Sequence, residues 1–220
     1  MATSVGLRAT KKARTRQAIS DAATELFMER GFEEVTVAEI AEAADVSIKT
    51  VFNYFATKED LYFDRAEELI ENLVRTITER PPGQTVAGSL RALMTENMVP
   101  FAGAGWRRLR DPDQYEQFRR FVETERASPT LQARRLVVAE SWGRRLTPVI
   151  ADELGLPPAD PRAEVFVAMA MAGLGVRHRV LTDGVLDRLS ARTIEKHVRA
   201  SVAEAYGRLE RAFADLDPPA

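Results

Sequence analysis

The sequence predicts an all-α protein in which a small N-terminal helix-turn-helix domain of three helices precedes a larger helical domain. Apolar residues recur through the 220 residues at the spacing of one helix face. The interruptions of this pattern fall at glycine, proline and capping residues, where helices end and begin. The sequence has no segment of alternating apolar and polar residues bounded by turns, which would indicate a half-buried strand. We expect a helix-turn-helix domain over residues 8–57, a connecting helix over 58–80 and a helical domain over 84–214.

The first helix is expected over residues 11–30. Gly31 follows it in the position where glycine commonly ends a helix. Its buried stripe is formed by apolar side chains at helical spacing: Ile19, Ala22, Ala23, Leu26 and Phe27.

Two short helices are expected next, separated by a tight break. Thr36 can cap the first of them, and Glu39 at its third position completes a capping box. Asp45 and Val46 form the break, and Ser47 can cap the second helix. The apolar face of the first short helix consists of Val37, Ile40, Ala41 and Ala44.

The second short helix carries polar residues on one side and apolar residues on the other. Val51 and Phe55, together with Val46 in the break, are expected in the core. A short polar helix that is buried on one side is suited to the major groove of DNA.

The remaining helices follow from the same rules. Thr57 can cap the connecting helix, and the Pro-Pro-Gly sequence at 81–83 ends it. Further helices are expected over 85–101, near Trp106, and over 113–126, 129–154, 161–181 and 191–213.

The composition argues against several functional classes. The chain has no cysteine, which excludes disulfides and thiolate chemistry. His178 and His197 lie on separate expected helices without a catalytic or metal-binding motif around them. We therefore expect no catalytic residue, no metal site and no cofactor. The longest apolar run, 165–176, is too short to cross a bilayer and the N-terminus has no apolar signal, so we expect a cytoplasmic protein without a membrane partner.

The distribution of charge is more informative than its sum. The net charge is -2, but five basic residues precede the first acidic one, Asp21. Contact with DNA would therefore depend on local positive charge, while the acidic residues point elsewhere. The other interpretation of the basic start is a solubilising tail.

The segments TVAEIA, VSIKTVFNYF and TKEDL, in this order and spacing within residues 36–61, resemble the N-terminal segment of the TetR family of transcriptional regulators. The resemblance implies operator contacts. Lys49 stands where the family often has glycine, and it could read guanine while Asn53 could pair with adenine. Positions that meet phosphates in the family are matched by Thr36, Tyr54 and Lys58. Positions that often meet bases or sugars are matched by Ile48, Lys49, Thr50, Phe52 and Asn53.

A second, more distant resemblance covers residues 120–166. This stretch is similar to a TetR subgroup whose C-terminal domain binds acyl-CoA-like ligands. A pocket for a small apolar ligand would lie among the middle helices, although many of its candidate residues could equally be core. The candidates are Met98, Phe101, Trp106, Phe118, Val122, Trp142, Phe166 and Met169.

The run 165–176 is apolar all round, so its helix must be buried on more than one side. One side can face the core and the other a second subunit, giving a homodimer bundle as the family resemblance implies. The alternative is a core helix of a monomer. The last helix supplies a partner stripe in the bundle: Ile194, Val198, Val202, Ala205 and Leu209.

Together these observations predict a DNA-binding repressor that resembles the TetR family. It would bind a palindromic double-stranded operator as a homodimer and be released by a small apolar ligand, for example acyl-CoA. The alternative is a helical acyl-CoA- or lipid-binding protein whose helix-turn-helix mediates protein contacts. Salt-sensitive binding to a palindrome separates the two hypotheses.

Overall fold

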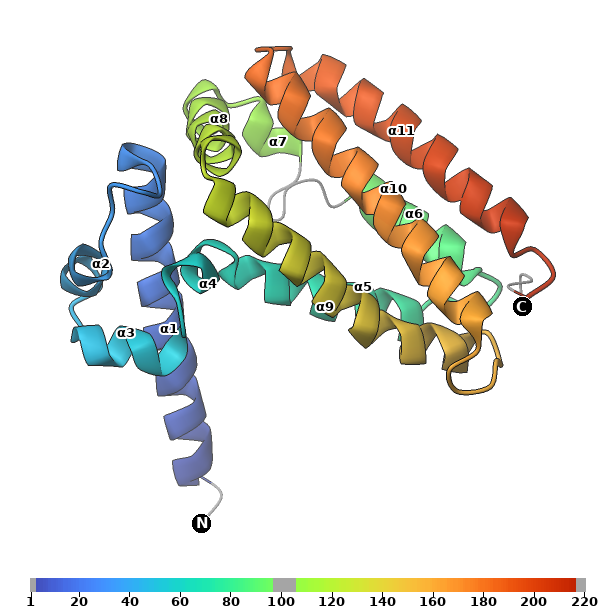
Figure 1. Ribbon diagram of the computed structural model, residues 1–220, viewed down its shortest axis with the longest axis horizontal. Coiled ribbons are helices and arrows are strands. Elements are labelled where there is room, and N and C mark those ends of the chain that lie inside the picture. The colour runs from blue at the N-terminus through green and yellow to red at the C-terminus, as the bar shows by residue number, and fades with distance from the viewer. Residues whose placement is uncertain (1–2, 97–105, 217–220) are drawn as a thin grey trace. The chain divides into compact units, whose positions relative to one another are not determined.

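The computed structural model describes residues 3–96 and 106–216, and this part of the chain is all-helical, as the sequence predicts (Figure 1). The helices are α1 (Thr3–Arg30), α2 (Val37–Ala43), α3 (Ile48–Tyr54), α4 (Lys58–Tyr62), α5 (Asp64–Thr78), α6 (Val86–Glu96), α7 (Trp106–Leu109), α8 (Pro112–Ala127), α9 (Pro129–Glu153), α10 (Pro161–Leu186) and α11 (Ala191–Ala212).

The helices form two compact units. The first comprises Met1–Asp64 together with Arg120–Arg134, and the second comprises Arg65–Arg119 together with Arg135–Ala220. The first unit thus contains α1 to α4, the end of α8 and the start of α9. The domain boundaries expected at residues 57 and 84 followed sequence order and stay a prediction. The contacts within the chain place one further segment, Arg120–Arg134, in the first unit.

The prediction of one connecting helix over 58–80 is wrong in one respect, because the helix is interrupted at Phe63. Here the backbone leaves the helical region, with φ -96° and ψ 14°, and α5 begins at the next residue. Leu61, Tyr62 and Phe63 are all buried. Three consecutive positions cover about 200° of a regular helix, which is more than one face. The break allows all three side chains to reach the interior.

Aromatic rings fill the core of the first unit. The rings of Phe27 and Phe32 have centroids 5.2 Å apart, and each lies 6.0 Å from the ring of Tyr62. Phe27 is fully buried and Phe32 is 2% exposed. This cluster joins the end of α1 and the loop after it to α4, which sets the frame on which α2 and α3 rest.

In the second unit α10 and α11 lie side by side, and both pack on α6 (Figure 1). Close approach is possible because Gly173 on α10 faces the ring of Tyr206 on α11; a Cβ at this glycine would lie 3.0 Å from Tyr206 Cε2. The stripe on α11 that was expected to face a second subunit is instead largely buried within this chain. Its fully or almost fully buried members are Ile194, Val198, Val202 and Leu209.

A buried arginine links α10 to α6 in this unit. Arg177 on α10 is 2% exposed, and its Nε donates a hydrogen bond to the Met94 carbonyl at 3.0 Å. This hydrogen bond joins α10 to Met94 on α6. Burial lowers the pKa of Arg177 to about 10, which leaves the side chain charged at neutral pH.

By length and composition alone, α10 could cross a membrane, because the helix extends well beyond the apolar run 165–176. The core helix of a soluble protein passes the same test. Its packing on α11 and α6 and its buried Arg177 agree with a core helix.

Candidate nucleic-acid interface

Reciprocal hydrogen bonds fix the start of α2. The Thr36 hydroxyl accepts from the Glu39 amide at 3.3 Å, and a Glu39 carboxylate oxygen accepts from the Thr36 amide at 2.8 Å. These contacts make the capping box that the sequence predicts. Arg30, at the end of α1, pairs with the same carboxylate at 2.7 Å. The first helix of the motif is therefore anchored at its N-terminus.

The turn into α3 is equally well defined. Asp45 has a φ of 52°, in the left-handed region, and the Val46 amide donates to the Ala41 carbonyl at 2.9 Å. Ser47 then caps α3, since its hydroxyl accepts from the Thr50 amide at 3.0 Å. The side chain of Thr50 contacts the Ser47 hydroxyl at 2.8 Å and so takes part in the cap.

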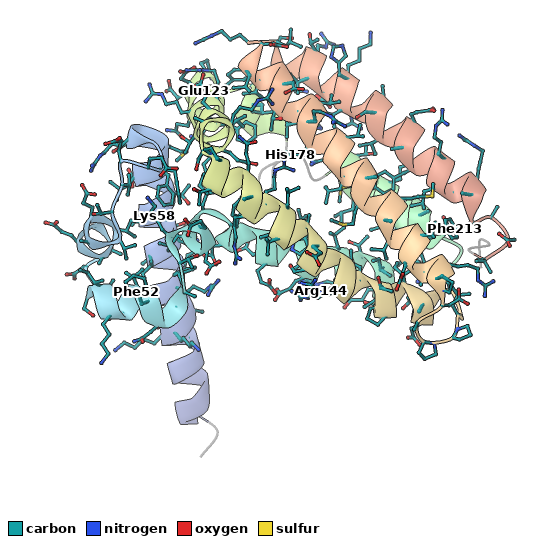
Figure 2. All side chains as sticks on the ribbon, in the orientation of Figure 1. Phe52, Lys58, Glu123, Arg144, His178 and Phe213 are labelled. Atoms are coloured by element: carbon teal, nitrogen blue, oxygen red, sulfur yellow. The ribbon has the colours of Figure 1, made fainter. Side chains whose placement is uncertain are left out.

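The two sides of α3 differ sharply. Val51 and, just after the helix, Phe55 are 1% and 2% exposed, as expected of core residues. On the opposite side two large apolar residues face solvent: Ile48 is 47% exposed and Phe52, marked in Figure 2, is 51% exposed. Lys49, Asn53, Ile48 and Phe52 form what we call the outer face of α3, and all four are exposed. An exposed apolar pair among polar donors is typical of a contact surface.

Lys58 is engaged within the protein. Its Nζ donates to the carbonyls of Phe32 at 2.9 Å and Val35 at 3.1 Å, and lies 4.1 Å from the centroid of the Phe32 ring. The side chain therefore ties the start of α4 to the loop between α1 and α2. Its expected role as a phosphate contact stays a prediction, to be weighed against this structural role.

Arg16 is a site residue that sequence reasoning missed, because it counted only as part of the basic start. It donates from Nη1 to the Tyr54 carbonyl at 3.2 Å and pairs through Nη2 with Asp64. Its partners lie 38 and 48 positions along the chain, so no local pattern could reveal them.

The candidate ligand-binding residues are not brought together as a set. Met98 and Phe101 lie outside the described residues. Val122 belongs to the first unit, whereas the other described candidates belong to the second. Phe166 is fully buried and packs on Phe213 with ring centroids 5.0 Å apart. Trp106 and Trp142 are buried, and Phe118 and Met169 are half-buried. Membership of a ligand pocket stays a prediction for these residues.

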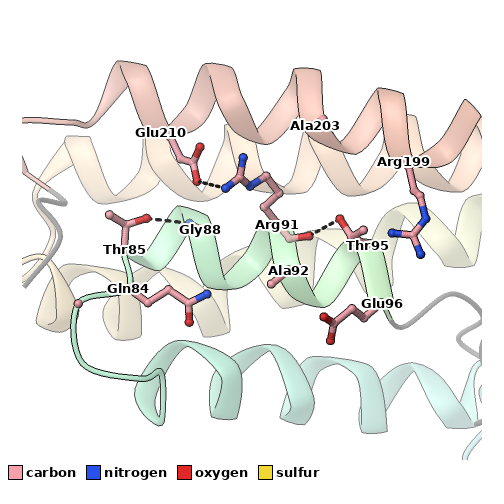
Figure 3. A pocket seen from close by; sticks show the side chains of 11 residues that line it. Gln84, Thr85, Gly88, Arg91, Ala92, Thr95, Glu96, Arg199, Ala203 and Glu210 are labelled. Carbon is pink, nitrogen blue, oxygen red and sulfur yellow. Dashed lines mark hydrogen bonds and ion pairs between the residues drawn. The ribbon is translucent and has the colours of Figure 1, made fainter. Parts of the chain in front are cut away.

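Two other features of the second unit are relevant to ligands. The indole N–H of Trp106 is buried and has no hydrogen-bond acceptor among the described residues. A groove of about 510 Å³ lies between α6 and α11, lined by polar side chains that include the Arg91–Glu210 ion pair (Figure 3). It contains none of the candidate ligand residues. Its lining is Gly83, Gln84, Thr85, Gly88, Arg91, Ala92, Thr95, Glu96, Arg199, Ala203 and Glu210.

Two capped short helices, with the second one half-buried and half-open, define a helix-turn-helix protein. Residues 19–64 match the family described as "Bacterial regulatory proteins, tetR family". Over these residues the chain carries the N-terminal segment of the TetR family of bacterial regulatory proteins. This is a family of regulatory proteins and not of enzymes, in agreement with the expectation from the sequence.

Individual relatives support the same assignment. The chain is 37% identical over 93 residues to the HTH-type transcriptional regulator TcmR of Streptomyces glaucescens, an alignment that covers 40% of this chain and 41% of TcmR. The chain thus spans less than half the length of the curated relatives that it matches.

Solved structures resemble the fold over most of the chain. One is NalD, the secondary repressor of the MexAB-OprM multidrug efflux pump in Pseudomonas aeruginosa, with a TM-score of 0.53, 20% identity, and coverage of 89% of this chain and 96% of that one. Another is FadR from Bacillus subtilis in complex with stearoyl-CoA, with a TM-score of 0.51, 17% identity, and coverage of 86% and 98%. At these identities the likeness concerns the fold alone.

Proposed function

We propose that this protein is a cytoplasmic transcriptional repressor that binds a palindromic double-stranded operator as a homodimer and leaves it when a small apolar ligand binds. The observation that carries the proposal is the outer face of α3, which presents two polar and two apolar side chains to solvent from a helix capped at its start and buried on its other side.

Each residue of this face has a chemistry that suits a base edge. The Lys49 ammonium can donate to guanine O6 and N7, and the Asn53 amide can pair with adenine. Ile48 and Phe52 can contact thymine methyl groups and sugars. Thr50 and Tyr54 lie on α3 itself and Thr36 caps α2, and each can contact phosphates or sugars through its hydroxyl.

An exposed stripe on α10 supports the homodimer. Val165, Ala168, Ala172 and Gly175 are all exposed and recur at three- and four-residue spacing, and Val165 is 52% exposed. Small residues at this spacing allow the backbones of two helices to approach closely. A second copy of the chain would cover the stripe and bring two α3 helices to one palindrome.

The ligand site is proposed for the second unit, beside Trp106. The indole N–H of Trp106 is a buried donor with no acceptor within residues 3–96 and 106–216, and an acceptor on a ligand could satisfy it. The structure of FadR was solved in complex with stearoyl-CoA, and we therefore choose a long-chain acyl thioester as the first probe. In the second unit, the residues proposed for testing as contacts of such a ligand are Trp106, Phe118, Trp142, Phe166 and Met169.

Selection from a random duplex library tests operator binding. We expect the protein to enrich a palindrome whose half-sites lie about one helical turn, or a small multiple, apart. Lys49→Ala and Asn53→Ala should each cost about 1–3 kcal/mol on the selected duplex and less on a scrambled duplex. No enriched duplex would overturn the proposal in favour of a helix-turn-helix that binds protein.

Titration with stearoyl-CoA tests release. By linkage, a ligand that weakens operator binding must itself bind more weakly to the operator complex, by the same factor. Equal affinity for the free and the DNA-bound protein would exclude this compound as an inducer.

A further inference from the structure

We infer that Arg16 and Asp64 form a positioning pair that holds α3 in its DNA-reading orientation. The inference rests on the proposed operator binding. It assigns to Arg16, on α1, a role in orienting α3 that requires no contact between Arg16 and DNA.

The geometry places one side chain against three segments of the first unit. From α1, Arg16 Nη1 donates to the carbonyl of Tyr54, the last residue of α3, at 3.2 Å. Nη2 pairs with the carboxylate of Asp64, the first residue of α5. The guanidinium carbon lies 4.5 Å from the centroid of the Phe55 ring, directly after α3. The planar fork of an arginine suits this arrangement, because separate N–H groups reach the carbonyl and the carboxylate while the guanidinium lies over the ring.

The contact with Tyr54 lies at a position where a cation is favourable. The last carbonyls of a helix have no partner within the helix, and they carry the negative end of its dipole. Because α3 has only seven residues, contacts at its two ends have a strong influence on its direction. The C-terminal anchor from Arg16 complements the N-terminal cap from Ser47, so both ends of the recognition helix are held.

The pair acts on geometry more than on stability. The Asp64 side chain is 11% exposed, but that of Arg16 is 42% exposed, and solvent screens a pair of this kind. Its loss should therefore leave the fold intact while α3 becomes free to tilt. Asp64 also begins α5, whose later residues belong to the second unit, so a shift at the start of α5 would reach α3 through Arg16.

A phosphate contact and a positioning role predict opposite signs for Asp64. Removing a negative charge near DNA strengthens binding if only charge matters. If Asp64 instead orients Arg16, its neutralisation weakens reading of the operator. Asp64→Asn is therefore more informative than any change of Arg16 itself.

The experiment uses the full chain with the duplex that the wild-type protein selects and a scrambled duplex of equal length, each at several salt concentrations. Arg16→Ala, Asp64→Asn and the double variant are compared with Arg14→Ala, which removes an exposed charge from the same helix. Circular dichroism and the thermal midpoint monitor folding.

We expect Arg16→Ala and Asp64→Asn each to weaken binding to the selected duplex on the order of tenfold, as for loss of a hydrogen bond to a charged group. The double variant should be no weaker than either single variant, because both remove the same link. Arg14→Ala should weaken both duplexes alike. If Arg16→Ala did not fold, Arg16→Lys, which keeps the charge but not the fork, should show the same selective loss.

Unchanged or stronger binding of Asp64→Asn to the selected duplex would overturn the inference while leaving the proposed function standing. So would an equal loss on both duplexes for Arg16→Ala, with a salt slope lower by about one, because that is the behaviour of a phosphate contact. Failure of the wild-type protein to select any duplex would instead overturn the proposed function, and this inference with it.

Discussion

The ring of Tyr62 lies flat on the ring of Phe121, with centroids 4.2 Å apart and planes at 8°, and its hydroxyl donates to the Phe121 carbonyl at 2.9 Å. This contact joins α4 to α8 across 59 positions of the sequence. Two further contacts add to it: Arg134 pairs with Asp60, and Ser128 donates to Glu33 at 2.6 Å. The segment Arg120–Arg134 is thereby a structural part of the helix-turn-helix unit.

We predict that Tyr62→Phe lowers the free energy of unfolding by about 0.5–1.5 kcal/mol, because it keeps the stacked ring but removes the buried hydrogen bond to the Phe121 carbonyl. Burial raises the pKa of Tyr62 well above its usual range, so the phenol is a donor at any working pH. Urea denaturation measures the change. Tyr115→Phe is the control: its hydroxyl donates to the Leu189 carbonyl at 2.8 Å, but Tyr115 is only half-buried and water can replace the bond. Equal losses for both variants would contradict the burial argument.

Local signals predicted the helix-turn-helix correctly. The caps at Thr36, Ser47 and Thr57 depend on residues within three positions of one another, and all three are present. The buried positions of α3 followed from helical spacing alone. The DNA contacts predicted for residues of α3 stay predictions, and they depend on the exposure that the helix gives each residue.

Contacts between distant segments were not predictable in this way. Nothing near Arg16 in the sequence indicates Tyr54 or Asp64. The interruption at Phe63 arises because tertiary burial of consecutive residues outweighs the helical tendency of the segment. The apolar stripe of α11 was predicted, but not which surface it faces, since a core and a subunit interface require the same pattern.

Lys58 should prove to be structural as well as electrostatic. Lys58→Met keeps the aliphatic stem but removes hydrogen bonds from a charged donor to the Phe32 and Val35 carbonyls. We expect a loss of about 1.5–3 kcal/mol in unfolding free energy, together with a salt slope of operator binding that falls by about one. Lys49→Met, on the exposed face, should change the slope without affecting stability. A Lys58→Met protein as stable as wild type would show that the two carbonyl contacts contribute nothing.

Gly173 should resist substitution because of Tyr206. A Cβ at Gly173 would lie 3.0 Å from Tyr206 Cε2, and the Tyr206 hydroxyl is held by the Ala170 carbonyl at 3.0 Å, so the ring cannot easily move away. We expect Gly173→Ala to destabilise by about 1–3 kcal/mol. Gly143→Ala is the matched control on α9, where a Cβ would meet nothing within 4 Å. It should gain up to about 1 kcal/mol from helix propensity. Thermal or chemical denaturation that ranked the two variants the other way would refute the packing argument.

The capping box should make stability depend on acid pH. Hydrogen bonds from the backbone and side chain of Thr36, and then the bond from Arg30, lower the pKa of Glu39 to about 2, from an ordinary 4.5. A carboxyl whose folded pKa is depressed contributes stability above its unfolded pKa, and this is lost as the pH falls through the folded value. Wild-type thermal midpoints should therefore decline between about pH 5 and pH 2 more steeply than those of Glu39→Gln. Parallel curves would mean that the cap is not sensitive to this charge.

The subunit interface can be tested at Ala172, in the middle of the exposed stripe on α10. In a single chain Ala172 faces solvent, so Ala172→Glu should fold with little loss of stability. In the proposed homodimer the carboxylate would be buried without a partner, which costs several kcal/mol, so the dimer dissociation constant should rise by about a hundredfold or more. Operator affinity should fall with it, because one α3 helix reads only half a palindrome. Sedimentation equilibrium measures the dissociation constant, and Ala18→Glu, exposed on α1, controls for the added charge. An Ala172→Glu protein that dimerises as tightly as Ala18→Glu would remove α10 from the interface.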